Sequence, residues 1–230
     1  MPIPSVSHQS LPEKIFLYLA ACSKSLALGN YLLKFSFLMR RAAEPLLFKD
    51  GRHIKHLYLD YFNWFSTHIN LSDTVLDIGS GNGQLSEHIS NSCKFVVAVE
   101  ISPRLYNYSR KILRNRDNIN FVNDCIFNFL KYNTTSFDVV ILSNVLEHLQ
   151  DRSSLLQALK KLKCSLLIRV PDAERDWANL YLNDIKSVWI SDYTHQIEHN
   201  SYELEHELVS AGFTLVSLDS RFGELYVCCE

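Results

Sequence analysis

Long apolar runs, an excess of basic residues and paired cysteines are all missing from this sequence of 230 residues. No run approaches the ~18 apolar residues that a membrane-spanning helix needs, and the first residues lack the basic segment of a secretory signal. The formal net charge of −2 gives no electrostatic reason to expect a nucleic-acid partner. We therefore expect a cytoplasmic protein that does not bind nucleic acid.

The six cysteines include no C-x-x-C pair, so the spacing typical of a zinc site or a redox motif is absent. We expect them to be reduced thiols, as is usual in the cytoplasm. Asp172, Asp176 and Asp192 are the acidic residues that come closest to a ligand set, but their spacing matches no strong metal motif. The sequence therefore predicts no metal site.

Glycine is scarce, with seven residues in the chain, but three of them lie close together. An apolar run over residues 74–78 contains Asp77, and Gly79, Gly81 and Gly83 follow it. An apolar strand, a glycine-spaced turn and an amphipathic segment predict one βα unit of a parallel sheet. Such sheets bind ligands outside the carboxyl ends of their strands. No P-loop Gly-Lys-Ser/Thr follows, and the Asp77 carboxylate favours a cationic or hydroxyl-bearing ligand over a diphosphate.

Two further predicted strands are followed by an acid. The apolar run over residues 95–99 ends at Glu100, about twenty residues after the glycines, where an acid commonly accepts hydrogen bonds from ribose hydroxyls. The run over residues 119–122 is followed by Asn123 and Asp124. This arrangement indicates that the ligand contains a ribose.

A fourth apolar run, over residues 137–142, leads into Ser143, Asn144 and the triplet Glu147-His148-Leu149. These four segments, in this order, resemble the class I S-adenosylmethionine-dependent methyltransferases, and in particular the branch that acts on small molecules and sugars. The resemblance covers about residues 70–230.

The resemblance implies an α/β fold with a Rossmann-like, seven-stranded, mostly parallel sheet that ends in an antiparallel hairpin. It also implies helices on both faces of the sheet, extra N-terminal helices and S-adenosylmethionine as the cofactor. The residues that it implies for cofactor binding are Asp77, Gly79, Ser80, Gly81, Gly83, Glu100, Ile101, Asp124, Cys125, Ser143 and Asn144.

Within that set, the resemblance assigns Glu100 to the ribose hydroxyls and Asp124 to the adenine amino group. Structural alternatives are open for both residues, since Glu100 could be a solvated strand end and Asp124 could cap the next helix. The glycines could serve only a tight turn. Asp77 could be a buried acid that accepts hydrogen bonds from the loop amides.

We expect the chain to have two parts, an N-terminal arm with a helical cover or lid over residues 1–70 and the methyltransferase domain over residues 71–230. Residues 1–12 are expected to form a loose arm, and residues 13–48 are apolar and helical in character. These helices would either cover the substrate side or lie at a membrane interface. We favour the cover, so membrane association is the less favoured alternative.

Three more local predictions concern turns and helices. Residues 49–53 are predicted to form a turn, and residues 56–69 a single helix with an aromatic stripe. A later helix is predicted over residues 202–211, with Ser201 as its N-cap.

The candidate catalytic residues are His195, His148 and His199. Methyl transfer to oxygen benefits from a base with a pKa near neutrality, which is a property of histidine. His195 follows Asp192 in an Asp-x-x-His segment that resembles those of sugar methyltransferases, and Asp192 could orient its ring. The alternative is that His195 packs against or caps the next helix. His148 more often shapes the cofactor pocket in this family, and His199 ranks third.

The sequence therefore predicts an S-adenosylmethionine-dependent methyltransferase for a small molecule or a sugar-containing intermediate, with oxygen as the acceptor atom. A second hypothesis is methylation of a lipid or quinone at a membrane surface, based on the apolar N-terminal segment. A third is a non-catalytic protein that binds S-adenosylmethionine. The acceptor and the oligomeric state are left open.

Overall fold

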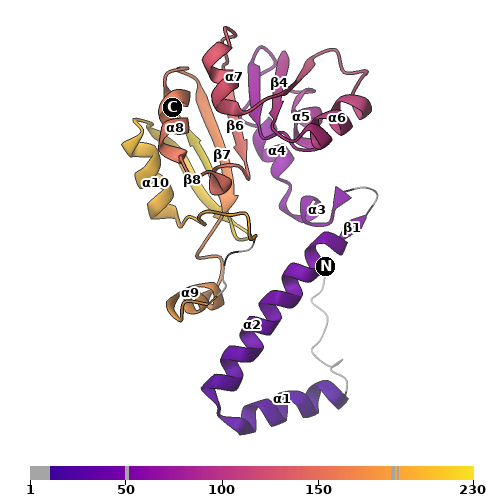
Figure 1. Ribbon diagram of the computed structural model, residues 1–230, viewed down its shortest axis with the longest axis vertical. Helices are drawn as coiled ribbons and strands as arrows, with labels where there is room; N and C mark the ends of the chain where they lie inside the picture. Colours follow the sequence, from indigo (N-terminus) through magenta and orange to yellow (C-terminus); the bar gives the residue numbers. More distant parts are fainter. Residues whose placement is uncertain (1–10, 50–51, 188–189, 191) are drawn as a thin grey trace.

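The computed structural model describes residues 11–49, 52–187, 190 and 192–230. Its centre is a seven-stranded sheet with the strand order β5-β4-β3-β6-β7-β9-β8 (Figure 1). Neighbouring strands from β5 to β7 are parallel, whereas β9 is antiparallel to both β7 and β8. The predicted sheet and its terminal hairpin are confirmed. The strands are β3 (Thr74–Ile78), β4 (Phe95–Glu100), β5 (Ile119–Asn123), β6 (Val139–Ser143), β7 (Ser165–Pro171), β8 (Leu215–Arg221) and β9 (Glu224–Cys229).

Strand side chains alternate between two apolar layers, one on each face of the sheet. Leu76 and Ile78 lie in one layer and Val75 in the other, as the two-residue period of a strand requires. Helices therefore cover both faces, as predicted. The first layer is covered by α7 (Ile126–Tyr132), α8 (Arg152–Lys160) and α10 (Ser201–Ser210), and the second by α4 (Tyr61–Ser66), α5 (Gln84–Ile89) and α6 (Pro103–Ile112).

The single helix predicted over residues 56–69 is wrong. The segment forms two short helices, α3 (Lys55–Leu59) and α4, because Asp60 takes a left-handed backbone conformation with φ of 48°. The Asp60 carboxylate accepts a hydrogen bond from Asn63 Nδ2 at 2.8 Å. This local bond competes with helix continuation at Asp60. Just before α3, a short hairpin pairs β1 (Phe48–Lys49) with β2 (Arg52–His53), where a turn was predicted.

The predicted N-cap of α10 is also wrong by one residue. Asn200 is the cap, since its Oδ1 accepts a hydrogen bond from Glu203 N at 2.8 Å. In return, Glu203 Oε2 accepts a hydrogen bond from Asn200 N at 3.2 Å. This reciprocal capping box makes Ser201 the first residue of the helix.

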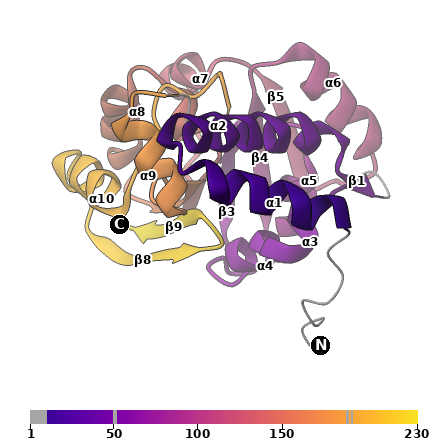
Figure 2. The ribbon, with the colours of Figure 1, turned by 90° about the horizontal axis from the view of Figure 1, so that it is seen from below.

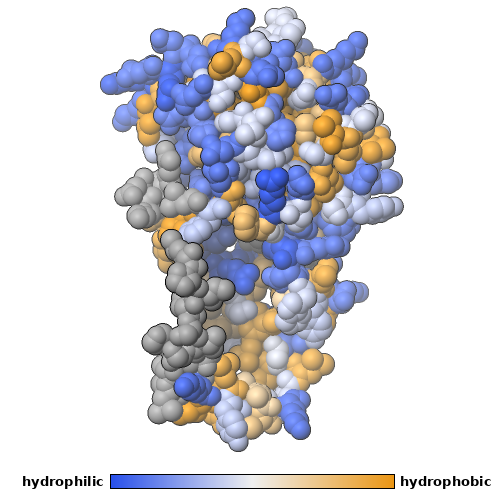
Figure 3. Space-filling view, turned by 180° about the vertical axis from the view of Figure 1, so that it is seen from behind, coloured by the Kyte–Doolittle hydropathy of each residue, from blue (hydrophilic) through white to orange (hydrophobic). Residues whose placement is uncertain are grey.

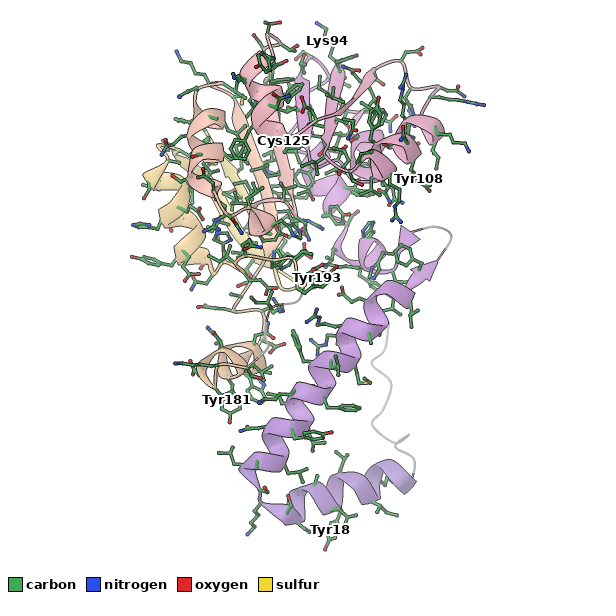
Figure 4. The ribbon with its side chains drawn as sticks, viewed as in Figure 1. Tyr18, Lys94, Tyr108, Cys125, Tyr181 and Tyr193 are labelled. Carbon is green, nitrogen blue, oxygen red and sulfur yellow. The ribbon has the colours of Figure 1, made fainter. Side chains whose placement is uncertain are left out.

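Two N-terminal helices, α1 (Leu11–Ser23) and α2 (Leu26–Ala43), extend away from the sheet (Figure 1). Seen from below, they cross the side on which the parallel strands end (Figure 2). No residue of α2 is buried. The Tyr181 hydroxyl of α9 (Trp177–Asp184) reaches toward α2 and donates a hydrogen bond to Asn30 Oδ1 at 2.6 Å (Figure 4). The expected N-terminal arm lies outside the described residues as far as residue 10.

Apolar side chains are visible at the end of the molecule that α1 and α2 form (Figure 3). Within the parts of the chain that the structure describes, no helix combines the length and the apolar character that a membrane crossing requires. The predicted division of the chain at residue 70 leaves α4 on the N-terminal side. Tyr61, Trp64 and Phe65 of α4 nevertheless lie buried in the same layer as Val75, so α4 packs with the sheet.

Candidate active site

The glycine loop between β3 and α5 has a backbone that few other residues could adopt. Gly79 and Gly81 have φ values of +69° and +57°, in the left-handed region that favours glycine. A Cβ atom on Gly79 would also lie 2.6 Å from Val145 Cγ2. Gly83 has a different surrounding, because a Cβ there would lie 2.9 Å from Ser109 Cβ of α6. Gly83 therefore allows α5 to pack closely on α6.

Glu100, at the end of β4, is bound to the glycine loop. Its Oε2 accepts a hydrogen bond from Gly81 N at 2.8 Å, and its Oε1 accepts one from Ser102 N at 2.7 Å. The side chain is buried, so the alternative of a solvated strand end is not supported. Ile101, the next residue in the predicted set, is exposed beside it. Contact of Glu100 with a ribose stays a prediction.

Asp77, near the end of β3, is 1% exposed. Its Oδ2 accepts a hydrogen bond from Ser86 Oγ at 2.5 Å. Burial raises the pKa of Asp77 to about 7, and the nearby charge of Glu100 acts in the same direction. A buried carboxylate of this kind gains from a cationic neighbour, because the neighbour favours the charged form.

Asp124 and Cys125 follow β5 at the same edge of the sheet. Asp124 Oδ1 accepts hydrogen bonds from Cys125 N at 2.8 Å and from Asn128 Nδ2 at 2.9 Å. The carboxylate thus stabilises the first turn of α7. This role is similar to the alternative that Asp124 caps the next helix. Its contact with an adenine amino group stays a prediction.

A small cavity of about 100 Å³ lies against the glycine loop. Ser80 Oγ is buried and has no hydrogen-bond partner among the described residues. The site offers the buried carboxylates of Asp77 and Glu100 and the unpaired hydroxyl of Ser80 beside the glycine loop. These groups fit a ligand that carries hydrogen-bond donors and a positive charge. These features suit the ribose and sulfonium of S-adenosylmethionine. The cavity is lined by His56, Tyr61, Phe62, Asp77, Gly79, Ser80, Asn82, Gln84, Leu85, Ser143 and Arg169.

Arg169 of β7 is a buried cation at the centre of the site, 5% exposed. Its Nη2 donates a hydrogen bond to Asn144 Oδ1 at 2.6 Å, and its Nη1 lies 3.2 Å from Glu224 Oε2. The guanidinium carbon lies 3.6 Å from the centre of the Tyr61 ring, a cation–π contact. Glu224 forms a second ion pair with Lys55.

Sequence reasoning missed this network. The signal was Arg169 itself, the one charged residue in the apolar run over residues 165–170. Its partners come from distant segments and could not be read from spacing. Two of the residues predicted for cofactor binding lie here. Asn144, which has a φ of 55°, belongs to the network through its hydrogen bond with Arg169, and Ser143 lines the small cavity.

His195 and His148 are brought together, as two of the predicted catalytic residues. Their ring centres are 4.7 Å apart, and η2 (Leu146–His148) carries Glu147 beside them. His195 Nδ1 lies 3.0 Å from Glu198 Oε1, and His195 Nε2 lies 4.0 Å from Glu147 Oε1. Burial lowers the pKa of His148, and the charge of His195 lowers it further.

The predicted partner of His195 is wrong, because Glu198 and not Asp192 holds its ring. Asp192 Oδ1 instead accepts a hydrogen bond from Thr194 Oγ1 at 2.9 Å. Thr194 Oγ1 in turn lies 3.0 Å from His148 Nδ1. The loop that carries these residues lies at the edge of the sheet facing α2, where Tyr193 is labelled in Figure 4.

His199 is not placed with the other two histidines. Its side chain is 0% exposed, and Nε2 lies 2.8 Å from Glu207 Oε2 of α10. Its carbonyl accepts a hydrogen bond from Ala173 N at 2.8 Å. His199 therefore fixes α10 to the segment after β7, a structural role that does not suit a general base.

A larger cavity, of about 330 Å³, lies between α2 and the ends of β6 and β7. We name it the acceptor-side cavity. Asn144 lines the acceptor-side cavity and accepts a hydrogen bond from Arg169, which lines the small cavity. The two cavities therefore flank one hydrogen-bonded pair. The acceptor-side cavity is lined by Phe37, Arg40, Arg41, Glu44, Lys55, Leu59, Asn144, Pro171, Arg175, Asp192, His195, Phe222, Gly223 and Glu224.

Known proteins with similar sequences are methyltransferases of several kinds. An rRNA adenine N-6-methyltransferase from Limosilactobacillus reuteri is 33% identical over 64 residues, which cover 28% of this chain and 26% of the relative. A ubiquinone biosynthesis O-methyltransferase from Haemophilus ducreyi is 30% identical over 108 residues, which cover 44% of this chain and 46% of the relative. The chain thus spans less than half the length of either relative.

Solved structures share the fold. The structure described as a DhpI-SAM-HEP complex has a TM-score of 0.57 and 18% identity, and the match covers 90% of this chain and 99% of that chain. A family model described as a methyltransferase domain matches residues 51–218, which include the glycine loop, the acids after the strands and both clustered histidines. The match spans well over half of the sequence, and the chain therefore belongs to the methyltransferase-domain family, within the class I S-adenosylmethionine-dependent methyltransferases.

Proposed function

We propose that the protein transfers the methyl group of S-adenosylmethionine to oxygen of a small molecule or a sugar-containing intermediate. The observation that carries this proposal is the pair of cavities on the two sides of Asn144 and Arg169. The small cavity has the glycine loop and Asp77 for the cofactor. The acceptor-side cavity has His195 and a polar lining for the acceptor. Two bound molecules would then meet at one edge of the sheet.

On the cofactor side, Glu100 would accept hydrogen bonds from the ribose hydroxyls and Asp124 from the adenine amino group. Asp77 would face the positively charged part of the molecule, where its ionised form is favoured. When bound, the cofactor supplies an electrophilic methyl group on a sulfonium. The chain's contribution is to hold both molecules in line and to exclude water, which can supply much of the rate acceleration.

On the acceptor side, His195 is oriented to receive a proton from the acceptor. Because the Glu198 carboxylate can only accept a hydrogen bond, His195 Nδ1 donates to it, and Nε2 is the ring atom that would take up the proton. Phe37, Arg40 and Arg41 of α2 lie across the same cavity. We propose that α1 and α2 form the cover that the sequence predicts for this side.

Mass spectrometry of reactions with S-adenosylmethionine and a panel of phenols, catechols and sugars tests the proposal. We expect S-adenosylhomocysteine to form together with one singly methylated acceptor. The matched control is Glu100→Gln, which should form far less of both. If the protein binds S-adenosylhomocysteine in calorimetry but methylates nothing in the panel, the non-catalytic binding hypothesis gains instead.

A second candidate is an acceptor carried by a membrane, such as a lipid or a quinone. Large apolar side chains of α1 and α2 are exposed, among them Leu17, Leu19 and Leu38, and α2 ends with Arg40 and Arg41. An apolar surface edged by cations suits an anionic membrane interface. The name of the Haemophilus ducreyi relative, which refers to ubiquinone biosynthesis, agrees with such an acceptor.

Co-sedimentation with anionic vesicles separates the two candidates. The membrane candidate predicts that the full chain sediments with vesicles and that the double variant Leu17→Ser, Leu19→Ser does not. Equal and negligible sedimentation of both proteins would leave only the water-soluble acceptor. The name of the Limosilactobacillus reuteri relative refers to an rRNA acceptor, but a net charge of −2 does not favour binding of a nucleic acid by this chain.

A further inference from the structure

Glu147, His148 and His195 bring three potential metal-binding atoms to one point. One carboxylate oxygen of Glu147 and one ring nitrogen of each histidine lie within 4.8 Å of one another. Within the described residues, no other group of three such side chains is found. The sequence predicted no metal site because the spacing of Asp172, Asp176 and Asp192 matches no strong metal motif. Among the described residues, these three acids do not form a group of this kind.

The hydrogen bonds around the two rings show which nitrogen of each ring is engaged. Thr194 Oγ1 donates its only proton to Asp192 Oδ1, so His148 Nδ1 must be the donor in its contact with Thr194. His195 Nδ1 must likewise donate to the Glu198 carboxylate. Nδ1 of both rings is thus engaged as a donor, which leaves Nε2 of each ring as the nitrogen that a metal ion could take in place of a proton.

Glu147 adds a third potential ligand to this space. Its side chain is 0% exposed, and neither carboxylate oxygen has a hydrogen-bond partner among the described residues. A buried carboxylate without a donor is costly, because burial removes its hydration and nothing replaces it. A cation between the two rings and this carboxylate would supply the partner that Glu147 lacks among the described residues.

The surrounding contacts have the form of a metal site's outer shell. In such sites, a metal-binding histidine usually donates its other ring N–H to a carboxylate, a carbonyl or water. His195 does so to Glu198, whose Oε2 is in turn paired with Arg175 Nη1 at 2.5 Å. The backbone also closes the site, since Gln196 N donates to the carbonyl of Glu147 at 2.7 Å.

We propose that Glu147, His148 and His195 together bind one divalent transition-metal ion at the wall of the acceptor-side cavity. Two imidazoles and one carboxylate suit Zn²⁺, Co²⁺, Fe²⁺ or Mn²⁺, whereas Mg²⁺ prefers a shell made of oxygen. Bonds of about 2.0–2.1 Å in a tetrahedral shell place neighbouring ligand atoms about 3.4 Å apart, so the three side chains would move inward on binding. Three protein ligands leave coordination positions open for another molecule.

His195 also lines the acceptor-side cavity, so an open position of the ion faces the space for the acceptor. This part of the inference rests on the proposed function. The ion would bind a hydroxyl oxygen of the acceptor and lower its pKa, which favours a catechol, a vicinal diol or a hydroxy acid as the substrate class. With the ion bound, the ion takes the place of His195 in activating the acceptor hydroxyl, because a ring nitrogen that binds a metal cannot also accept a proton.

Titration of the chelator-treated full chain with Co²⁺ tests the metal site directly, because bound Co²⁺ absorbs visible light. We expect one equivalent to bind with an intense visible band. We expect Glu147→Gln and His195→Ala each to weaken binding by at least about 100-fold, and Glu198→Gln to weaken it about 10–100-fold, as outer-shell changes do. His206→Ala, which removes an exposed histidine of α10, is the matched control and should bind as the wild type does.

The proposal is overturned if the folded wild type binds no Co²⁺. It is equally overturned if Glu147→Gln and His195→Ala, folded by circular dichroism, keep the wild-type stoichiometry and affinity, since the ion would then be held elsewhere. S-adenosylhomocysteine is titrated into the same metal-free protein. Cofactor binding without metal binding would sink only the metal site, and the reverse result would sink only the proposed function.

Discussion

Val145 lies so close to Gly79 that a Cβ atom on Gly79 would be 2.6 Å from Val145 Cγ2. Gly79 begins the loop after β3, and Val145 lies just after β6, between Asn144 and the η2 turn that carries Glu147 and His148. The segment proposed to hold the cofactor and the segment proposed to hold the acceptor are thus in direct contact. A side chain at residue 79 would disturb both.

Gly79→Ala should therefore destabilise the protein by about 2–4 kcal/mol, the sum of backbone strain and overpacking. Gly81→Ala is the matched control, since φ is +57° there but the nearest atom to a new Cβ is 4.0 Å away. It should cost only the strain, about 1–2 kcal/mol. Urea denaturation measures both, and the double variant Gly79→Ala, Val145→Ala should recover part of the loss. Equal losses for the two single variants would show that Val145 does not restrict residue 79.

Asp77 should make the protein less stable as the pH rises toward neutrality. Its pKa is about 7 when folded, against a usual value of 3.8, so between these values the folded state holds one proton more than the unfolded state. The stability that this proton provides is complete below about pH 4 and is lost as the pH rises through 7. Asp77→Asn removes the titrating group. Denaturation at pH 5 and pH 8 should give a smaller difference for this variant than for the wild type, and an unchanged difference would contradict the assignment.

Arg169→Met should cost about 3–5 kcal/mol, because Glu224 would lose one of its cationic partners while staying buried. Adding Glu224→Gln to Arg169→Met should reduce the loss, since the uncompensated charge is then gone. Urea denaturation of the two variants gives the comparison. A double variant that is less stable than Arg169→Met would mean that Glu224 is satisfied without Arg169.

The parts of the fold that follow from local pattern were predictable. The apolar runs located β3, β4, β5 and β6, because buried parallel strands are continuously apolar. The interruption of the helix at Asp60 was not predictable. The aromatic residues keep their helical spacing on both sides of Asp60, so the sequence gives no sign of its left-handed backbone conformation. Ser201 and Asn200 are both good capping residues, and only the reciprocal bond with Glu203 decides between them.

The site shows the same limit. The glycine loop and Glu100 were recognisable because one short segment holds the loop and the strand end after it. The partner of His195 was not, since Asp192 and Glu198 each lie three residues away, and only the loop conformation turns the ring toward Glu198. Glu147 was visible beside His148 in the sequence, but its burial without a donor among the described residues depends on distant segments.

Calorimetric titration of the full chain with S-adenosylhomocysteine tests the central claim most directly, because it requires no knowledge of the acceptor. We predict one binding site of micromolar affinity. Glu100→Gln should weaken it by at least about tenfold, because charge-assisted hydrogen bonds are lost. A folded wild type that binds neither S-adenosylhomocysteine nor S-adenosylmethionine would contradict the account, and an unchanged affinity in Glu100→Gln would refute the ribose assignment.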